Sequence, residues 1–310
     1  MPSLVLSLCL LIAAHSASAQ TFPNIVAALN STGHFTVFSD LLAKSGILKD
    51  VNNSLHFTVF APTDEALAKL PAGTLTAIEG DPAKLADFVG THVVLTASFH
   101  LMGTQQDKQI RSTNNHWIRI NTYNILHTVT ADGVNITVKN IAVTHGTLHG
   151  LDGVLVPPTS SVSQIAFKRA DLSNFTSLVV KANLINYLTA SSDGTYFIPS
   201  NDAISKLSPA ALTYLEAHPA DLAETIKYHI VRSMTVFSLG LKHSLSMTSA
   251  DNNHDLLMFL EDGSGGFIIN DAKIVEKDII ATDGVIHVID KVLIPSRVQA
   301  HIDDFGAVVG

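Results

Sequence analysis

The sequence predicts an α+β protein made of two homologous domains in tandem. Its 310 residues are enough for about two domains of ordinary size. The chain repeats itself at a spacing of 137 to 138 residues, and each copy has helix-like segments first and strand-like segments last. That order is typical of α+β domains, whereas an α/β domain would alternate helices and strands.

The repeat consists of sequence blocks that keep their order in both copies. A proline-centred block, Phe57–Leu67, resembles Gly194–Ile204, which lies 137 residues later. A closing block, Gly146–Pro157, resembles Gly284–Pro295 at a spacing of 138 residues. This period is too long for a solenoid repeat. We therefore predict a signal peptide, a first domain, a short linker, a second domain and a C-terminal tail at residues 1–19, 20–157, 158–161, 162–298 and 299–310.

The first residues have the pattern of a secretory signal peptide. Leu4–Ala14 is an apolar run too short to cross a bilayer, and small residues follow at Ala17 and Ala19. A buried N-terminal helix is the alternative, since no Lys or Arg precedes the run. We expect cleavage after Ala19, which removes the only cysteine, Cys9, and leaves no disulfide or thiol chemistry.

Export predicts an extracellular protein, either freely secreted or retained in a matrix or cell wall. The net charge of −8 argues against a nucleic-acid partner, because phosphate binding needs clustered positive charge. No later apolar run reaches the roughly 20 residues of a membrane span, and residues 301–310 lack the hydrophobic tail of a lipid-anchor signal. Asn-x-Ser/Thr sequons give four glycosylation candidates: Asn30, Asn52, Asn135 and Asn174.

The early part of each copy predicts helices around one strand. Apolar spacing predicts a helix over 35–42 that ends before Gly46, a position taken by Asn183 in the second copy. Alternation over 55–60 predicts a strand that ends at Pro62. Thr63 and Ser200 are then placed to cap a helix with an acidic first turn.

A further helix and several strands complete each copy. Asp81-Pro82 predicts a helix start, and the spacing of its counterpart places His229 on an apolar helical face. Asp132-Gly133 predicts a hairpin turn between strands at 126–129 and 134–138. The glycine-rich segment Glu261–Gly266 separates strands at 256–260 and 267–270, so it is a hairpin loop and not a phosphate cradle.

These blocks resemble the conserved boxes of the fasciclin (FAS1) family of secreted adhesion domains. Phe57–Leu67 resembles the first box, Gly284–Pro295 the second, and Tyr228-His229 the tyrosine-histidine motif between them. The first copy departs at that motif, with Thr91-His92. The resemblance implies a wedge-shaped β-sandwich flanked by α-helices in each domain, and an adhesive role without established catalysis or cofactor.

The resemblance also implies adhesion candidates, in the second domain only. In animal members, an Asp-Ile pair before the second box and the Tyr-His region are linked to integrin recognition. The matching residues here are Asp278, Ile279, Tyr228 and His229. Asp278 has a plainer interpretation as a solvated acid on a strand-edge loop. His229 likewise has a plainer interpretation, as a buried and hydrogen-bonded ring, because a histidine recurs at this place in both copies.

The sequence contains no pattern that favours an enzymatic function. His145 and His149 are four residues apart, a spacing that brings two imidazoles together on a helix but not on the turn and strand expected there. No third ligand follows at a recognised spacing, so we predict no metal. Serine-hydrolase, zinc-protease, P-loop and dinucleotide motifs do not occur in the sequence.

The leading hypothesis is a secreted, non-enzymatic adhesion, matrix or cell-wall protein that binds cell-surface proteins, glycans or further copies of itself. An extracellular module for a small ligand or polysaccharide is the alternative. It is less favoured because the chain has a single tryptophan, Trp117, to stack on a sugar. A metal-assisted hydrolase that uses His145 and His149 is a distant third.

Overall fold

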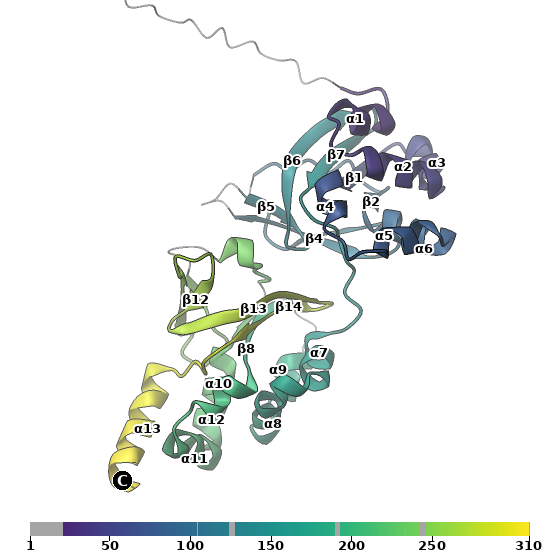
Figure 1. Cartoon of the computed structure of the whole chain (residues 1–310). Helices are drawn as coiled ribbons and strands as arrows, with labels where there is room; N and C mark the ends of the chain where they lie inside the picture. The colour runs from purple at the N-terminus through teal and green to yellow at the C-terminus, as the bar shows by residue number, and fades with distance from the viewer. Residues whose placement is uncertain are drawn as a thin grey trace, which may run out of the picture.

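The computed structural model describes residues 21–103, 105–123, 128–189, 193–232, 234–241 and 246–309. The predicted signal peptide lies outside them. Two α+β domains follow one another, joined by a segment without helix or strand between Leu151 and Val162 (Figure 1). Each domain has a seven-stranded sheet flanked by helices, so the predicted fold class is confirmed.

In the first domain most helices precede the sheet. They surround one early strand in the order α1 Ile25–Ser31, α2 Thr36–Lys44, α3 Ile47–Asn53, β1 Phe57–Pro62, α4 Asp64–Ala68, α5 Thr74–Glu79 and α6 Pro82–Thr91. The remaining strands are β2 Val93–Val94, β3 Lys108–Arg111, β4 Trp117–Tyr123, β5 Thr128–Ala131, β6 Val134–Val143 and β7 Gly146–Leu151.

The second domain repeats this order and ends in one more helix. Its first half contains α7 Val162–Lys168, η2 Ala170–Leu172, α8 Ser173–Lys181, α9 Ile185–Thr189, β8 Gly194–Pro199, α10 Asn201–Ser205, α11 Pro209–Ala217 and α12 Pro219–Tyr228. Its second half contains β9 Ile230–Arg232, η3 Ser238–Gly240, β10 Ser246–Thr248, β11 Leu256–Glu261, β12 Phe267–Ile269, β13 Ala272–Ala281, β14 Gly284–Ile289 and α13 Ser296–Val309.

The two sheets have the same topology. The strand order is β2-β1-β7-β6-β5-β4-β3 in the first domain and β9-β8-β14-β13-β12-β11-β10 in the second. The early strand of each domain pairs in parallel with the last one, β1 with β7 and β8 with β14. The long strands β6 and β13 each contain two register shifts, which bend the sheet so that its two halves face each other.

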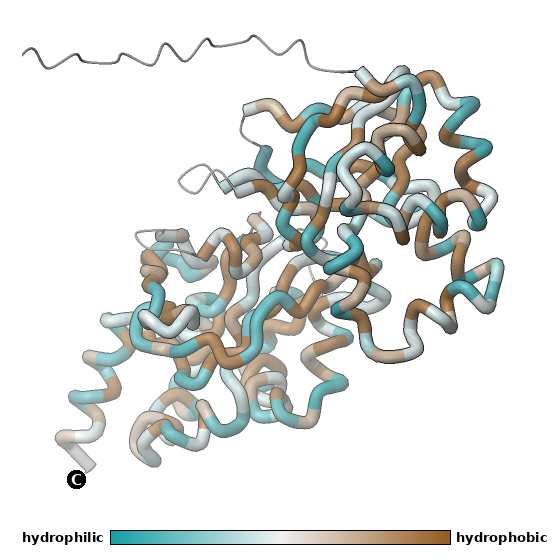
Figure 2. The backbone as a smooth tube through the Cα atoms, turned by 45° about the horizontal axis from the view of Figure 1, so that its top comes forward, coloured by the Kyte–Doolittle hydropathy of each residue, from teal (hydrophilic) through white to brown (hydrophobic). Residues whose placement is uncertain are grey.

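Each domain therefore has two hydrophobic cores. One lies between the helices and the sheet and includes Phe35, Phe38 and Leu41 in the first domain. The other lies between the two halves of the sheet and includes Phe60 and Ile120. Hydrophobic stretches consequently occur along the backbone of both domains alike (Figure 2). Burial of this apolar surface stabilises the fold of a chain whose predicted mature form has no disulfide.

Several local predictions agree with the structure. Gly46 and Asn183 both have left-handed φ angles, of 82° and 57°. The side chains of Thr63 and Ser200 accept the backbone N–H groups of Ala66 and Ala203, as helix caps do.

The first strand differs from its prediction. It runs from Phe57 to Pro62 and is buried on both faces, while Leu55 lies outside it and is exposed. The reason is that β1 is an inner strand, covered by helices on one face and by the other half of the sheet on the other. Alternation between apolar and other residues therefore did not correspond to alternation in exposure.

The later segments show one agreement and one difference. Asp132 and Gly133 have φ angles of 48° and 79° in the predicted turn between β5 and β6, whereas the predicted strand start at 126 lies outside the described residues. The residues expected to form a C-terminal tail belong, as far as Val309, to α13. This helix packs against the helical core of the second domain through Val298 and Ile302.

Candidate functional site

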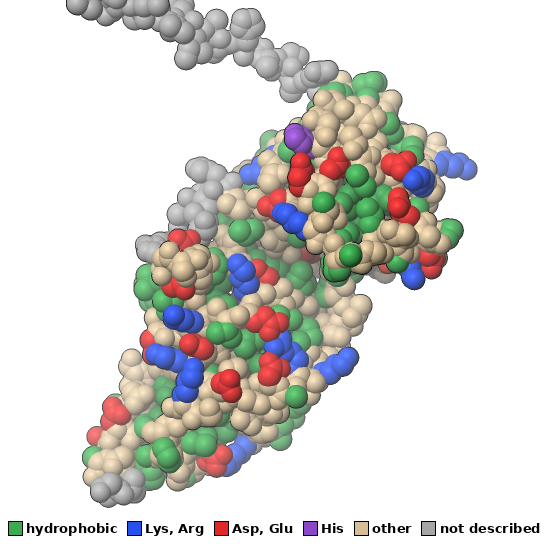
Figure 3. All heavy atoms as spheres, viewed as in Figure 1, with side chains coloured by type: hydrophobic (Ala, Val, Ile, Leu, Met, Phe, Trp, Pro, Cys, Tyr) green, Lys and Arg blue, Asp and Glu red, His purple; other side chains and the backbone are tan. Residues whose placement is uncertain are grey.

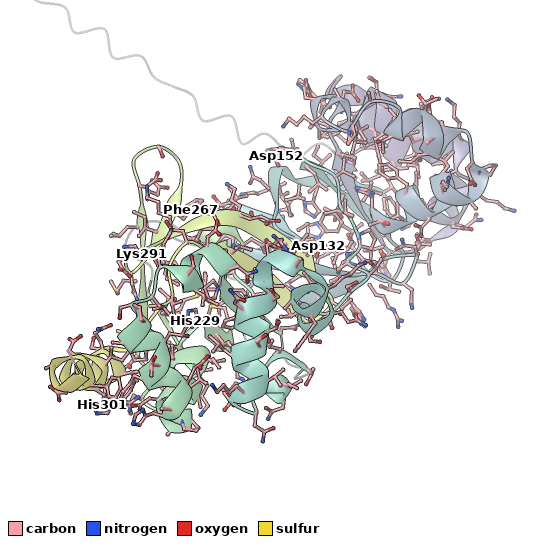
Figure 4. The ribbon with its side chains drawn as sticks, turned by 60° about the horizontal axis from the view of Figure 1, so that its bottom comes forward. Asp132, Asp152, His229, Phe267, Lys291 and His301 are labelled. Atoms are coloured by element: carbon pink, nitrogen blue, oxygen red, sulfur yellow. The ribbon has the colours of Figure 1, made fainter. Side chains whose placement is uncertain are left out.

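The motif histidine His229 is enclosed in the second domain (Figure 4). It ends α12 and is 1% exposed. Its Nδ1 lies 2.7 Å from the carbonyl oxygen of Thr225, and its Nε2 accepts the N–H of Leu293 at 3.0 Å. Because Nε2 accepts a backbone N–H, the ring proton must lie on Nδ1. The neutral ring thus ties the end of α12 to the segment that follows β14.

His92 makes the same contacts in the first domain. It is fully buried at the end of α6, its Nδ1 lies 2.9 Å from the carbonyl oxygen of Phe88, and its Nε2 accepts the N–H of Leu155. Burial lowers the pKa of both His92 and His229 to about 4, because a charged ring loses its hydration there. Both rings are therefore neutral at physiological pH.

A second pair of buried histidines holds the strands. His287 in β14 donates from Nε2 to the carbonyl oxygen of Val236 at 2.9 Å, while its Nδ1 accepts the N–H of Asp278. His149 in β7 does the same with Phe99 and Asn140, at 2.9 and 3.2 Å. Burial lowers the pKa of His149 to about 4 and lowers that of His287.

Asp278 lies in the bulge of β13 and contacts the segment after β9. Its φ angle is 59°, Oδ1 accepts the N–H of Ser238 at 2.6 Å, and Oδ2 accepts the hydroxyl of the same residue. Asn140 occupies the same place in β6, with a φ angle of 58°. Its amide oxygen accepts the N–H of Leu101 at 2.8 Å and its amide nitrogen donates to the carbonyl oxygen of Leu101. The two domains thus share this contact, although only one uses an acid.

The other two adhesion candidates are largely inside the fold. Ile279 is half-buried against the helical core of the second domain. Tyr228 is 7% exposed, and its hydroxyl donates to the carbonyl oxygen of Leu256 and accepts an N–H from Asn270. Burial raises the pKa of Tyr228. Asp278 and Tyr228 therefore hold different segments, the loop after β9 and the pair β11–β12.

The residues that join the two domains were not predicted. Arg119 in β4 is buried and forms ion pairs with Asp193 of the second domain at 2.7 Å and with Asp107 at 3.1 Å. Asn121 donates to the carbonyl oxygen of Thr235 at 2.6 Å, and Asp107 accepts the N–H of Thr235. Strand β4 lies on the side of the first domain that faces the second (Figure 1).

Aromatic rings complete this interface between domains. The hydroxyl of Tyr123 accepts the N–H of Phe237 at 3.1 Å, and burial raises the pKa of Tyr123 to about 12. A Cβ atom at Gly240 would lie 2.2 Å from the Tyr123 ring, and one at Gly133 would lie 2.4 Å from the Phe237 ring. Glycine at both positions therefore lets the domains approach closely. No sequence motif marks this contact, because its partners are far apart in the chain.

The metal hypothesis has no support in the geometry. His149 is buried with both ring nitrogens bonded, while His145 is an exposed turn residue. In the part of the chain that the structure describes, no group of three or more His, Cys, Asp or Glu side chains is arranged to hold a metal ion. On the face shown in Figure 3, acidic and basic side chains are interspersed over the second domain.

The glycosylation candidates differ in exposure. Asn30, Asn52 and Asn174 are exposed residues of helices. Asn135 is half-buried in β6 and donates to Asp152. Within the described ranges, no helix is both long enough and apolar enough to cross a membrane.

Comparison with protein-family models finds the fasciclin domain twice, at residues 33–157 and 170–295. The chain belongs to the fasciclin family. The resemblance inferred from the two boxes is thereby confirmed. Both matched segments contain the buried histidine pairs described above, so the pairs belong to the fasciclin domain of each copy.

Several curated relatives are similar over most of this chain. Human periostin is 25% identical over 271 residues, which are 84% of this chain and 31% of periostin. The pig transforming growth factor-beta-induced protein ig-h3 is 28% identical over 255 residues, 78% of this chain and 35% of that protein. A fasciclin-like arabinogalactan protein of Cercospora beticola is 24% identical over 317 residues, 96% of this chain and 81% of that protein.

The chain thus spans about a third of the length of periostin and ig-h3. Among solved structures, a FAS1 domain pair from the insect cell adhesion molecule Fasciclin I matches 86% of this chain and 99% of that one. The TM-score is 0.42 and the sequence identity 18%.

Proposed function

We propose that this protein is a secreted, non-enzymatic adhesion or matrix protein that binds cell-surface proteins or glycans outside the cell. The observation that carries the proposal is the pair of fasciclin domains, which covers most of the chain. Two curated relatives are named fasciclin-like arabinogalactan proteins, and a solved FAS1 domain pair is named as part of an insect cell adhesion molecule. The export signal expected at residues 1–19 agrees with an extracellular role.

The chemistry of the buried histidines supports a binding protein and not a catalyst. Each of His92, His149, His229 and His287 has both ring nitrogens in hydrogen bonds to the backbone. A general base needs a ring nitrogen that reaches a substrate proton. The four rings therefore serve the fold, and the exposed surface is left to carry the function.

We further propose that Asp278 positions a loop and does not ligand a receptor-held cation. Both of its carboxylate oxygens already accept hydrogen bonds from Ser238, and the neutral Asn140 makes the equivalent contact in the first domain. A hard cation would compete for these oxygens. The surface near Asp278 can still take part in binding, with Asp278 acting through the loop.

The adhesive function is tested with immobilised mature chain and the cells that produce it. Attachment should exceed that to an inert glycoprotein and should fall when the chain is unfolded before coating. Attachment should persist in a chelator and with Asp278→Asn, because the proposal needs no cation at Asp278. Equal attachment to the chain and to the inert glycoprotein would count against adhesion.

Secretion and glycosylation are tested on the same material. N-terminal sequencing should find Gln20 first, and mass spectrometry should find glycans at the exposed sequons Asn30, Asn52 and Asn174. Asn135 should be occupied least, because the residue is half-buried and its amide nitrogen donates to Asp152. Intracellular retention of the unprocessed chain would contradict the proposed location.

A further inference from the structure

The domains meet through two different surfaces. The first domain contributes the outer face of β4, with Arg119, Asn121 and Tyr123, which we call its tail face. The second domain contributes Asp193, Thr235, Phe237 and Gly240, which we call its head face. Because the domains are homologous, each must have a head face and a tail face. The contact within the chain uses one of each and leaves two free.

Strand pairing locates the free tail face in the second domain. In the first domain Ile120 pairs with Ala131, which pairs with Val134. In the second domain Phe259 pairs with Ile269, which pairs with Ala272. Phe259 is therefore equivalent to Ile120. It follows that Trp117, Arg119 and Asn121 correspond to Leu256, Met258 and Leu260.

The free tail face is apolar and exposed. Leu256, Met258 and Leu260 point away from the core of the second domain, and their exposed fractions are 56%, 46% and 45%. The alternate residues Leu257 and Phe259 are fully buried, so this row is the outer face of β11. Three large apolar side chains in a row on one strand mark an interaction surface more than single exposed residues do.

Shared hydrogen bonds locate the free head face in the first domain. The Thr58 hydroxyl donates to Ala97 and accepts the N–H of Phe99, just as Thr195 does with Met234 and Val236 in the second domain. Equivalent residues are thus 137 positions apart here. The free head face consists of His56, Ser98, His100 and Gly103, where the occupied one has Asp193, Thr235, Phe237 and Gly240.

This head face also has exposed apolar side chains at its margins. Leu55 directly precedes His56, and Met102 directly precedes Gly103; they are 72% and 73% exposed. A Cβ atom at Gly103 would meet nothing within 4 Å, whereas Gly240 in the occupied face is in contact with the Tyr123 ring. The free head face therefore has space where the occupied one holds a ring of the neighbouring domain.

The two free faces both lack the charged residues of the occupied contact. The occupied contact pairs Arg119 with Asp193. At the place of Arg119 the free tail face has Met258, and at the place of Asp193 the free head face has His56, so docking them would not bury one charge of this pair without the other. Both free faces present large apolar side chains instead. The absence of both charges fits two surfaces that meet.

We propose that the chain associates with itself from head to tail, with the tail face of the second domain in one copy docked on the head face of the first domain in the next. This inference rests on the proposed adhesive function and names a second copy as one of its partners. The contact between chains would repeat the contact within the chain. Such an interface is heterologous, so it produces open chains or rings and not a closed two-fold dimer.

The test uses sedimentation velocity of the mature chain over a range of concentrations up to about 0.5 mM. A tail variant carries Met258→Glu and Leu260→Glu, and a head variant carries Leu55→Glu and Met102→Glu. A matched control changes Val180→Glu and Ile185→Glu, which are exposed apolar residues on α8 and α9.

The wild type and the control should form species larger than a dimer as concentration rises, while each variant alone should remain monomeric. Mixed together, the two variants should form a dimer and nothing larger, because each keeps one intact face. That dimer also shows that both variants are folded. A monomeric wild type, or a head variant that still associates through two tail faces, would overturn the proposal.

Cell attachment separates this inference from the proposed function. Monomeric variants that still support attachment leave the adhesive function intact and assign it to a cell-surface partner. Self-association of a chain to which cells do not attach supports the head-to-tail contact and refutes the adhesive function. Sedimentation therefore tests the head-to-tail association, and cell attachment tests the adhesive function.

Discussion

The two domains are most alike in their buried histidines and least alike in the outer faces of β4 and β11. His92 and His229 make equivalent backbone contacts, as do His149 and His287. On the outer faces, the buried Arg119 corresponds to the exposed Met258. The interior contacts are needed by every copy of the fold. The outer residues depend on what each copy touches, so that is where the copies have diverged.

The largest expected effect is acid destabilisation of both domains. In the first domain the pKa values of His92 and His149 are about 4, against about 6.5 in the unfolded chain. The unfolded state therefore binds more protons between pH 6.5 and 4, and stability falls as the pH drops through that range. Each ring contributes up to about 3 kcal/mol. Urea unfolding at a series of pH values measures this loss.

The comparison predicts that Asp278 reduces this loss in the second domain. The negative charge of Asp278 opposes the lowering of the pKa of His287, whereas His149 has the neutral Asn140 in that place. A domain-specific probe of unfolding, such as amide exchange, measures the loss of stability in each domain separately. Stability that does not change between pH 6.5 and 4 would show that the rings are not held neutral.

The next effect is that of removing a motif histidine. His229→Ala leaves the N–H of Leu293 and the carbonyl of Thr225 without their partner and opens a cavity, at a cost of about 3–5 kcal/mol. His92→Ala should cost the first domain a similar amount, since its contacts are equivalent. Denaturant unfolding measures both, with His34→Ala as the exposed control. A large loss of stability from only one of the two substitutions would show that His92 and His229 are not equivalent.

A smaller effect is expected at the contact between the domains. Arg119→Met gives the first domain the methionine that Met258 supplies at the equivalent place in the second. It leaves Asp193 and Asp107 without their cation, so the free energy of unfolding should fall by about 2 kcal/mol. This cost is smaller than for a fully buried ion pair because both acids are partly exposed. Calorimetry should find the two domains unfolding less cooperatively. Arg111→Met, an exposed change on neighbouring β3, should leave the calorimetric profile unchanged.

Local chemistry explains which parts of the fold could be predicted. The caps at Thr63 and Ser200, the turn at Asp132-Gly133 and the left-handed positions Gly46 and Asn183 follow from the residues themselves. The internal repeat correctly indicated that His92 and His229 are equivalent. These features could be read from sequence because each depends on a few neighbouring residues.

What could not be predicted depends on residues distant in the chain. The ion pair of Arg119 with Asp193 forms only when two folded domains meet, and nothing near Arg119 in sequence marks it. The alternation at 55–60 did not reveal that strand β1 is buried on both faces, because the helices and strands that cover it come from segments before and after it in the chain. The resemblance suggested Asp278 as an adhesion candidate in the second domain only. The structure shows that Asp278 and Asn140 make equivalent loop contacts in the two domains, which the sequence does not reveal.

The smallest effect, and the sharpest test of the comparison, is expected for Asp278→Asn. An amide oxygen can still accept the N–H of Ser238, and the amide N–H group can donate to the Ser238 hydroxyl. Stability at pH 7 should therefore change by less than about 1 kcal/mol, whereas Asp278→Ala, which removes both contacts, should cost about 2–3 kcal/mol. Urea unfolding of the two variants side by side measures the difference.

The same substitution should make the second domain more sensitive to acid. Without the nearby negative charge, the pKa of His287 should fall further, so the second domain should lose more stability as the pH drops below 6.5. The reciprocal change, Asn140→Asp, should raise the pKa of His149 and make the first domain more resistant to acid. Asp278→Asn could abolish cell attachment while stability and the acid profile change as expected. That result would show that the carboxylate itself contacts a partner, and that Asp278 and Asn140 are equivalent only in holding the corresponding loop of each domain.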